Sequence, residues 1–232
     1  MIRWSPPGPY EVVFSTREGG VSEGPYASLN LGRLTGDDVE RVDENRRRLC
    51  AEIDADVERL ALNRQIHSTS VHRAEAGARG RPGDGLWTDE TGLPIMALAA
   101  DCLPIGLARA NGDAAAVAVL HAGWRGLLDG IVAQGVNVLG GEVHVAIGPG
   151  IGPCCYEVGP EVSQRYAASW GGGLVHGHNL DLWTAAERAL TAAGVEEVHR
   201  VDLCTHCNAD RFFSHRRTGE PRGVQGVIAR VR

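Results

Sequence analysis

Short apolar runs alternate along this chain with segments of helical periodicity, and glycine and proline separate them. The runs at residues 95–100 and 115–120 are apolar at nearly every position, which is typical of strands buried on both faces. Strand-like runs also lie at residues 11–15 and 60–66. A helix capped at residues 36–38 follows the first of them, because apolar residues then recur at every third or fourth position. The pattern predicts a mixed α and β protein.

The 232 residues are enough for one large domain, and no internal repeat or low-complexity segment divides them, so we expect residues 1–232 to form a single domain. The formal net charge is −6, which argues against nucleic acid and anionic membrane surfaces as partners. All 23 basic residues are arginines. Chemistry that needs a lysine, such as Schiff-base formation or a Walker-type phosphate site, is therefore excluded.

Neither a membrane-spanning apolar stretch nor a signal-like start is present, so we expect a cytoplasmic protein. Its cysteines should then be reduced and serve as core residues, metal ligands or nucleophiles. There are six of them: Cys50, Cys102, Cys154, Cys155, Cys204 and Cys207.

Three chemically capable side chains follow predicted strands: His67, Cys102 and His121. A strand fixes the position of a side chain at its end, and the following loop leaves that side chain accessible to a ligand. The three residues therefore suggest one shared site. Two imidazoles and a thiolate suit Zn²⁺ and leave a fourth position for water, as in catalytic zinc sites. His67 and Cys102 are 35 positions apart, and Cys102 and His121 are 19 apart, which is unlike the short ligand spacings of zinc fingers. Residue type alone favours a structural interpretation, in which Cys102 is a core thiol and each histidine is a satisfied polar group.

Residues 122–126 form a predicted turn into a helix, which places His121 beside a helix N-terminus where anions are favoured. The apolar positions of that helix are Leu127, Leu128, Ile131, Val132, Val136 and Leu139.

A series of motifs runs in order through nearly the whole chain, from about residue 14 to residue 228. The motifs lie at residues 15–22, 28–32, 65–67, 100–104, 121–126, 148–159, 204–207 and 212–217. Together they resemble the laccase-domain family, also called the polyphenol-oxidase-like or YfiH family, whose members include purine nucleoside phosphorylases. Such a series is far more specific than any single motif.

The resemblance implies a zinc site made of His67, Cys102 and His121, which would also be the catalytic residues. It implies phosphorolysis of adenosine, inosine, guanosine and S-methyl-5′-thioadenosine, together with adenosine deamination. The expected partners are therefore purine nucleosides and phosphate. The implied fold has four α/β/β/α layers with two packed mixed sheets, and it is related to a cysteine hydrolase fold. Cu²⁺ is the alternative ion, because it outcompetes Zn²⁺ at most nitrogen sites.

Phosphate has to be held by arginine or by backbone amides, because the chain has no lysine. The candidate substrate-binding residues are Arg17, Arg46 and Arg125. Each of them could equally be a structural or solvated guanidinium. For deamination, Asp101 is the candidate acid that protonates the leaving amine.

Other functions remain open. Cys102 could be the nucleophile of a cysteine hydrolase acting on cell-wall precursors, with His67 or His121 as base. A copper-dependent polyphenol oxidase fits poorly, because the segment from His176 to His178 is the only His-X-His in the chain. A non-enzymatic binding module would show a large exposed apolar patch and no metal.

The other cysteines give weak metal signals in the sequence. Cys204 and Cys207 form the chain's one C-X-X-C, whereas Cys154 and Cys155 are adjacent. A zinc ribbon needs two spaced pairs, so we expect a structural role for all four. The glycine-rich segment at residues 148–152 fails the spacing of a dinucleotide-binding loop and is expected to shape the site.

Overall fold

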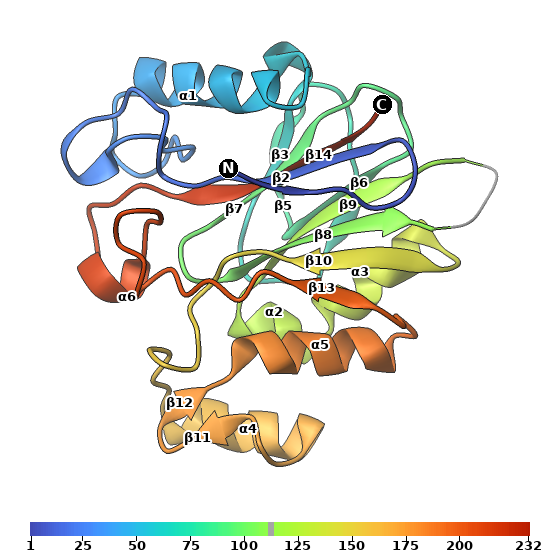
Figure 1. Ribbon diagram of the computed structural model, residues 1–232, viewed down its shortest axis with the longest axis vertical. Helices are drawn as coiled ribbons and strands as arrows, with labels where there is room; N and C mark the ends of the chain where they lie inside the picture. Colours follow the sequence, from blue (N-terminus) through green and yellow to red (C-terminus); the bar gives the residue numbers. More distant parts are fainter. Residues whose placement is uncertain (111–113) are drawn as a thin grey trace.

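Two six-stranded sheets pack face to face in the computed structural model, which describes residues 1–110 and 114–232 (Figure 1). The first sheet has the order β1 (Ile2–Trp4), β2 (Tyr10–Phe14), β14 (Gln225–Val231), β7 (Ile95–Ala99), β3 (Ala61–Arg64) and β5 (Arg79–Pro82). The second has the order β13 (Val198–Arg200), β10 (Val143–Ile147), β8 (Leu103–Arg109), β9 (Val117–Ala122), β6 (Gly85–Thr88) and β4 (Val71–Arg73).

Both sheets are mixed. In the first, β7, β3 and β5 run parallel as neighbours, while β1, β2, β14 and β7 pair antiparallel. In the second, β13 pairs parallel with β10 and β4 with β6, and the pairings from β10 through β8 and β9 to β6 are antiparallel. The predicted strands at 11–15, 60–66, 95–100 and 115–120 correspond to β2, β3, β7 and β9.

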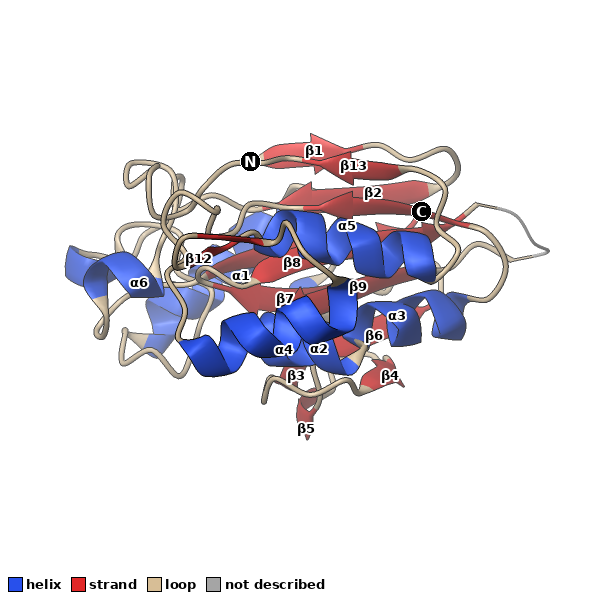
Figure 2. Cartoon of the chain, turned by 90° about the horizontal axis from the view of Figure 1, so that it is seen from below, coloured by secondary structure: helices blue, strands red, loops and turns tan. Residues whose placement is uncertain are grey.

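Helices cover the outer faces, which gives the expected α/β/β/α layers (Figures 1 and 2). Helix α1 (Val39–Ala51) packs on the first sheet through buried Val42 and Leu49. Helices α2 (Trp124–Asp129), α3 (Ile131–Leu139) and α5 (Leu182–Ala192) cover the second. A further apolar cluster, including Phe14, Val119 and Val227, fills the space between the sheets. Burial of these faces removes apolar surface from water and supplies most of the drive to stack the layers.

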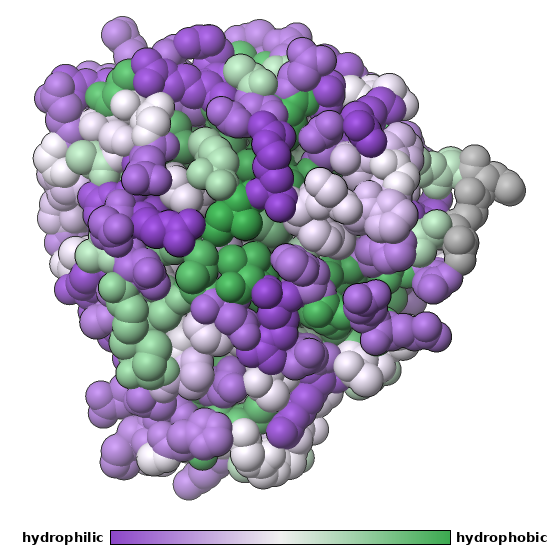
Figure 3. All heavy atoms as spheres, in the orientation of Figure 1, coloured by the Kyte–Doolittle hydropathy of each residue, from purple (hydrophilic) through white to green (hydrophobic). Residues whose placement is uncertain are grey.

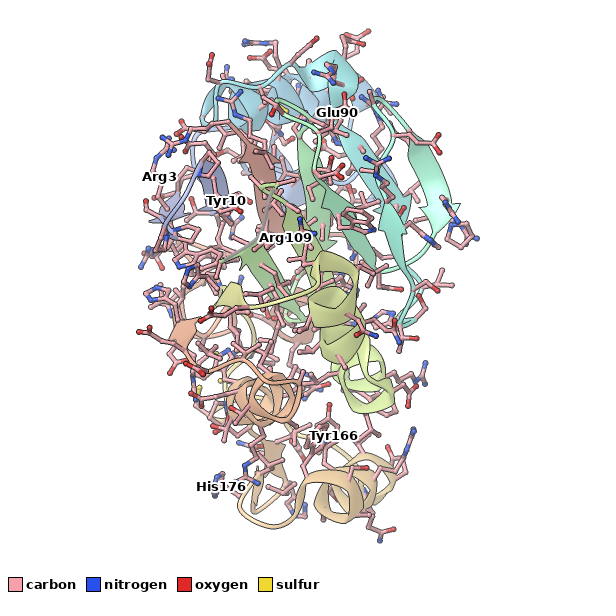
Figure 4. The ribbon with its side chains drawn as sticks, turned by 90° about the vertical axis from the view of Figure 1, so that its right-hand side faces the viewer. Arg3, Tyr10, Glu90, Arg109, Tyr166 and His176 are labelled. Atoms are coloured by element: carbon pink, nitrogen blue, oxygen red, sulfur yellow. The ribbon has the colours of Figure 1, made fainter. Side chains whose placement is uncertain are left out.

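The remaining elements lie outside the four layers. Helix α4 (Pro160–Trp170) and the hairpin of β11 (Val175–His176) and β12 (Asn179–Leu180) extend beyond α5, and Figure 4 shows Tyr166 and His176 in this region. Short helical turns are η1 (Gly24–Tyr26), η2 (Val57–Arg59) and α6 (His215–Thr218). No helix in residues 1–110 and 114–232 has the length and apolar character to cross a membrane.

Two expectations about helices are tested by the structure. The cap of α1 is confirmed, because the Asp38 side chain accepts hydrogen bonds from the amides of Glu40 and Arg41. The single helix expected after His121 is wrong. Gly130, with φ of 101°, ends α2 and begins α3, and this left-handed conformation suits glycine.

The chain alternates between the two sheets from β3 to β8. Three of these connections run from the first sheet to the second: β3 to β4, β5 to β6, and β7 to β8. Because β7, β3 and β5 are parallel neighbours, their carboxyl ends lie at the same end of the first sheet, and the chain leaves all three there. A side-chain hydrogen bond also links the two sheets directly. Tyr10 of β2 donates to the carbonyl of Arg109 in β8 at 2.7 Å (Figure 4).

Candidate metal centre

The three connections between the sheets bring together the side chains of the candidate site. His67 follows β3, Asp84 lies between β5 and β6, and Cys102 lies between β7 and β8. His121 reaches the same place from β9, where it pairs in register with Pro104 at the start of β8. Its amide also donates to the carbonyl of Asp84 at 2.7 Å. The parallel register of the first sheet therefore gathers His67, Asp84 and Cys102, and the strand pairing of the second sheet adds His121.

The donor atoms of His67, Cys102 and His121 lie within 4.8 Å of one another, so the structure brings the three predicted residues together. The Cys102 Sγ and His67 Nε2 atoms are 3.8 Å apart. The two imidazole rings meet edge to face, with centroids 4.9 Å apart and an interplanar angle of 73°. Two nitrogens and one sulfur converging in this way fit a Zn²⁺ ion that keeps one coordination position open.

Asp84 orients the centre. Its carboxylate accepts a hydrogen bond from His121 Nδ1 at 2.9 Å, which leaves His121 Nε2 free for a metal ion. The same carboxylate accepts from the amides of Ile66, His67 and Ser68 at 3.1, 3.0 and 2.6 Å, and from the Ser68 hydroxyl at 2.8 Å. One buried side chain thus fixes one candidate ligand directly and the backbone of another.

The charges of this group are coupled. Burial opposes ionisation of Asp84, but the hydrogen bonds from His121, Ser68 and Ile66 outweigh it and hold the pKa well below its usual range. Burial likewise opposes charge on Cys102 and His121. Their mutual attraction nevertheless lowers the pKa of the Cys102 thiol and raises that of His121. The site therefore favours a thiolate, which is the form of cysteine that binds metal ions.

Backbone strain and a missing side chain shape the same place. His67 and Asp101 have φ of 59° and 92°, a left-handed region that residues other than glycine seldom adopt. A Cβ atom on Gly123 would lie 2.6 Å from His67 Cδ2 and 3.0 Å from Cys102 Sγ. Only glycine at position 123 therefore leaves these two side chains where they are.

Asp101, which directly precedes Cys102, is held by three hydrogen bonds to other segments of the protein. Its Oδ1 accepts from the Thr205 hydroxyl at 2.6 Å and its Oδ2 from the amide of Arg216 at 2.7 Å. Its carbonyl accepts from the amide of Ile151 at 2.8 Å. Because both carboxylate oxygens are engaged by protein donors, Asp101 positions the turn that carries Cys102, and the geometry gives no support to its role as an acid.

Arg17 is held within its own loop region. Its Nε donates to the carbonyl of Ala27 at 2.7 Å and its Nη1 to that of Ala209 at 2.8 Å. The guanidinium also stacks on Phe213 at 4.7 Å from the ring centroid. These contacts hold the residue 17–28 loop against the segment around residue 210.

Arg46 is buried on α1. Its Nε donates to the carbonyl of Leu31 at 2.9 Å. Burial, with the nearby charges of Arg33 and Arg79, lowers the pKa of Arg46 to about 10. The side chain thus ties α1 to the loop it covers, on the outer face of the first sheet.

Arg125 stands apart from the other two. It is exposed at the start of α2, four positions after His121, and its guanidinium stacks on the Trp124 ring at 4.9 Å. The structure therefore does not bring the three predicted arginines together. Of the three, Arg125 is the nearest in sequence to a candidate metal ligand, His121. The predicted roles of all three in substrate binding stay predictions.

Asp84 is the site residue that the sequence interpretation missed. It lies between Gly83 and Gly85 in a segment with no helical or strand period. Its only signal was a lone carboxylate among glycines before a short β run. Tyr156 was also missed. Burial raises its pKa, and charge on Cys102 adds to this effect, which places the phenol in the electrostatic field of the site.

Comparisons with known proteins agree along the whole chain. The family model described as multi-copper polyphenol oxidoreductase laccase matches residues 11–231. The chain is 36% identical to the purine nucleoside phosphorylase YlmD of Geobacillus stearothermophilus, over 91% of this chain and 85% of that protein. It is also 36% identical to a purine nucleoside phosphorylase of Pseudomonas aeruginosa, over 93% of this chain and 91% of that protein. A crystal structure of a Neisseria meningitidis protein superposes with a TM-score of 0.88 at 30% identity, covering 99% of this chain and 98% of that one.

Proposed function

The chain belongs to the laccase-domain, or YfiH, family, and we propose that it is a zinc-dependent purine nucleoside phosphorylase with adenosine deaminase activity. The proposed substrates are adenosine, inosine, guanosine and S-methyl-5′-thioadenosine. The observation that carries the proposal is the convergence of His67, Cys102 and His121, with Asp84 behind His121. The names of the two relatives at 36% identity supply the reaction.

The residues present fit a zinc ion by their chemistry. His67, Cys102 and His121 would hold it. Asp84 would fix the tautomer of His121 by accepting a hydrogen bond from its Nδ1–H group. Bound Zn²⁺ supplies Lewis acidity for charge that develops on the substrate. The protein itself supplies a preorganised frame, since the buried Asp84 and the strained His67 backbone are already in position.

Phosphorolysis also needs a group that holds phosphate. We assign this role first to Arg125, because it is exposed, lies at the start of α2 and is placed by its contact with Trp124. A guanidinium is always charged and binds phosphate through two hydrogen bonds at once. Arg17 and Arg46 would act in substrate binding only through the loops that they hold.

A thiol hydrolase would use the same side chains differently. It needs one base beside Cys102, and His67 at 3.8 Å could serve. Two imidazoles converging on one thiol exceed that need, and they match the needs of a metal ion. We therefore place the cysteine hydrolase second.

The donor set also bears on the oxidase suggested by the family's description. An oxidase with a copper cluster needs many histidines close together. His176, from the one His-X-His, is exposed on the outlying hairpin (Figure 4). His67 and His121 with one thiol support a single ion, for which we propose Zn²⁺, with Cu²⁺ as the alternative.

A binding module is disfavoured by the surface. In the described part of the chain the exposed large hydrophobic residues are Met1, Leu34, Val39 and Ile66, which belong to separate segments. Figure 3 shows one face of the molecule, where hydrophobic side chains are recessed and bordered by hydrophilic ones. This is not the broad apolar patch that such a module would present.

The test is product analysis of adenosine incubated with the zinc-loaded protein, with and without phosphate. The proposal expects adenine and ribose 1-phosphate only when phosphate is present, and their loss in His67→Ala, Cys102→Ala and His121→Ala. His176→Ala, on the outlying hairpin, is the matched histidine control and should keep full activity. Inosine, guanosine and S-methyl-5′-thioadenosine are assayed in parallel.

Other outcomes separate the alternatives. Inosine formed without phosphate would make deamination the main reaction. Folded, zinc-loaded protein that gives neither product would reject the purine assignment. If the metal-free protein hydrolyses a substrate and alkylation of Cys102 abolishes this activity, the thiol hydrolase is established instead.

A further inference from the structure

Four cysteine thiols that are far apart in sequence meet at a second place in the structure. Cys154 and Cys155 lie in the turn after β10, and Cys204 and Cys207 lie in the turn after β13. The four Sγ atoms all lie within 4.8 Å of one another. Cys207 Sγ is 3.6 Å from that of Cys154 and 3.3 Å from that of Cys155. The spacing along the chain had argued against a metal site, but the parallel pairing of β10 and β13 brings the two pairs together.

The backbone holds the two turns in register. Gly150 and Cys204 form a parallel bridge, and the Thr205 amide donates to the Gly150 carbonyl at 3.0 Å. The Gly152 amide donates to Cys204 Sγ at 3.3 Å. The Asn208 side chain donates to the Cys204 carbonyl at 2.8 Å. The Gly152 amide is aimed at the Cys204 sulfur, and such a donor stabilises a thiolate at this position.

We propose that Cys154, Cys155, Cys204 and Cys207 form a second metal site, a tetrahedral four-cysteine zinc site with a structural role. Four thiolates at a Zn–S distance of about 2.3 Å stand about 3.8 Å apart in a tetrahedron. The observed S···S distances of 3.6 and 3.3 Å are already close to that spacing. All four ligands come from the protein, so the site is closed, as structural zinc sites are.

Two other uses of four thiols fit less well. A disulfide joins sulfurs only in pairs, whereas Cys207 Sγ lies close to the thiols of both Cys154 and Cys155, so pairing does not account for the convergence of all four. An iron–sulfur cluster spreads its thiolates over several irons, so they stand farther apart than the ligands of one ion. The compact spacing therefore favours a single ion with a preference for sulfur.

The location gives this ion a task. The turn that carries Cys204 continues into Thr205, whose hydroxyl binds the carboxylate of Asp101, and Asp101 precedes Cys102. The turn that carries Cys154 begins at Ile151, whose amide binds the Asp101 carbonyl. An ion that fastens both turns would thus brace the wall that positions Cys102. The inference does not depend on the reaction proposed above.

The test is the zinc-to-protein ratio, measured by mass spectrometry of the metal in protein purified under reducing conditions. The His67→Ala/His121→Ala double variant removes two candidate ligands of the first centre, and it should retain about one zinc per chain where the unaltered protein holds about two. Replacing that zinc with Co²⁺ should give the intense visible absorption of a tetrahedral four-thiolate complex. Neither measurement alters the four-cysteine cluster, so neither depends on a cysteine variant that fails to fold.

Cysteine variants complete the test. Cys207 is exposed, so Cys207→Ser should lose one zinc without disturbing the core, and Cys207→His should regain it, because three cysteines and a histidine also bind zinc. Cys50→Ala changes a buried cysteine outside both clusters and should keep about two zinc ions. The proposal is overturned if the double histidine variant holds no zinc and no Co²⁺. It is also overturned if alkylation of unfolded, freshly lysed protein shows a disulfide within the cluster.

Discussion

The Asp84 carboxylate accepts a hydrogen bond from His121 Nδ1 at 2.9 Å, and both side chains are buried. Asp84 comes from the connection between the sheets and His121 from a strand of the second sheet. The contact therefore joins the two layers and sets the direction in which His121 presents its other nitrogen.

Asp84→Asn should weaken zinc binding by about 10- to 100-fold, the range found when the partner of a ligating histidine is removed. The amide cannot accept from His121 and three backbone amides as the carboxylate does. Competition with a zinc-binding dye measures the affinity. Asp89→Asn, which changes an exposed partner of Arg73, is the control and should bind zinc normally. Equal affinity in the two variants would show that Asp84 does not act on the metal centre.

Gly123→Ala should weaken zinc binding by about tenfold or more, equivalent to about 1.4 kcal/mol. The backbone at Gly123 has φ of −75°, which alanine accepts, so the effect would come from the collision of the new Cβ with His67 and Cys102. Zinc titration together with the thermal unfolding temperature of the metal-free protein separates binding from folding. Gly172→Ala adds a methyl group in open space and should change neither. A Gly123 variant with normal affinity would show that the added methyl group does not displace His67 and Cys102 from their positions in the site.

Arg125→Ala should lower kcat/KM for phosphate by about 10- to 100-fold, the loss of about 1.5–3 kcal/mol expected for a hydrogen bond to a charged group. Its zinc content should not change. The measurement is the initial rate of adenosine phosphorolysis as phosphate is varied. Arg165→Ala is a matched control, because Arg165 also stacks on Trp124 but is paired with Asp129. If both variants lose activity equally, the effect belongs to the packing of Trp124 and not to phosphate.

Thr205→Val should destabilise the protein by about 1–3 kcal/mol, because it removes a buried donor from the Asp101 carboxylate without changing the side-chain shape. Urea unfolding of the metal-free and zinc-loaded forms measures the free energy of unfolding. Thr191→Val changes an exposed threonine of α5 and should alter the free energy of unfolding by no more than about 0.5 kcal/mol. An unaltered stability in Thr205→Val would show that Asp101 is held by its other contacts alone.

The strands and the cap of α1 could be predicted from local signals, whereas the candidate ligand set of His67, Cys102 and His121 followed from the family resemblance, because residue type alone favoured a structural interpretation. Apolar runs mark β7 and β9, Asp38 marks the helix cap, and His67 and Cys102 come shortly after strand-like runs. The order of strands within each sheet has no such signal, since it depends on pairings between distant segments. That order decides which residues meet.

Residues that act only through long-range contacts were hidden for the same reason. Asp84 belongs to no periodic segment, and its importance appears only once His121 is placed beside it. The two cysteine pairs look unrelated at about 50 positions apart, and they meet because β10 and β13 are parallel neighbours. The break at Gly130 was not predicted, because apolar periodicity on both sides of it suggested one continuous helix.

The three connections between the sheets also bear on when the candidate metal centre can assemble during folding. Because His67, Asp84 and Cys102 are brought together only after β7, β3 and β5 have paired, and His121 only after the second sheet has docked, no partly folded chain presents the complete set of ligands. A bound ion would therefore stabilise the finished native state alone. Because such an ion would bind only the completed arrangement, we expect it to slow unfolding more than it speeds folding.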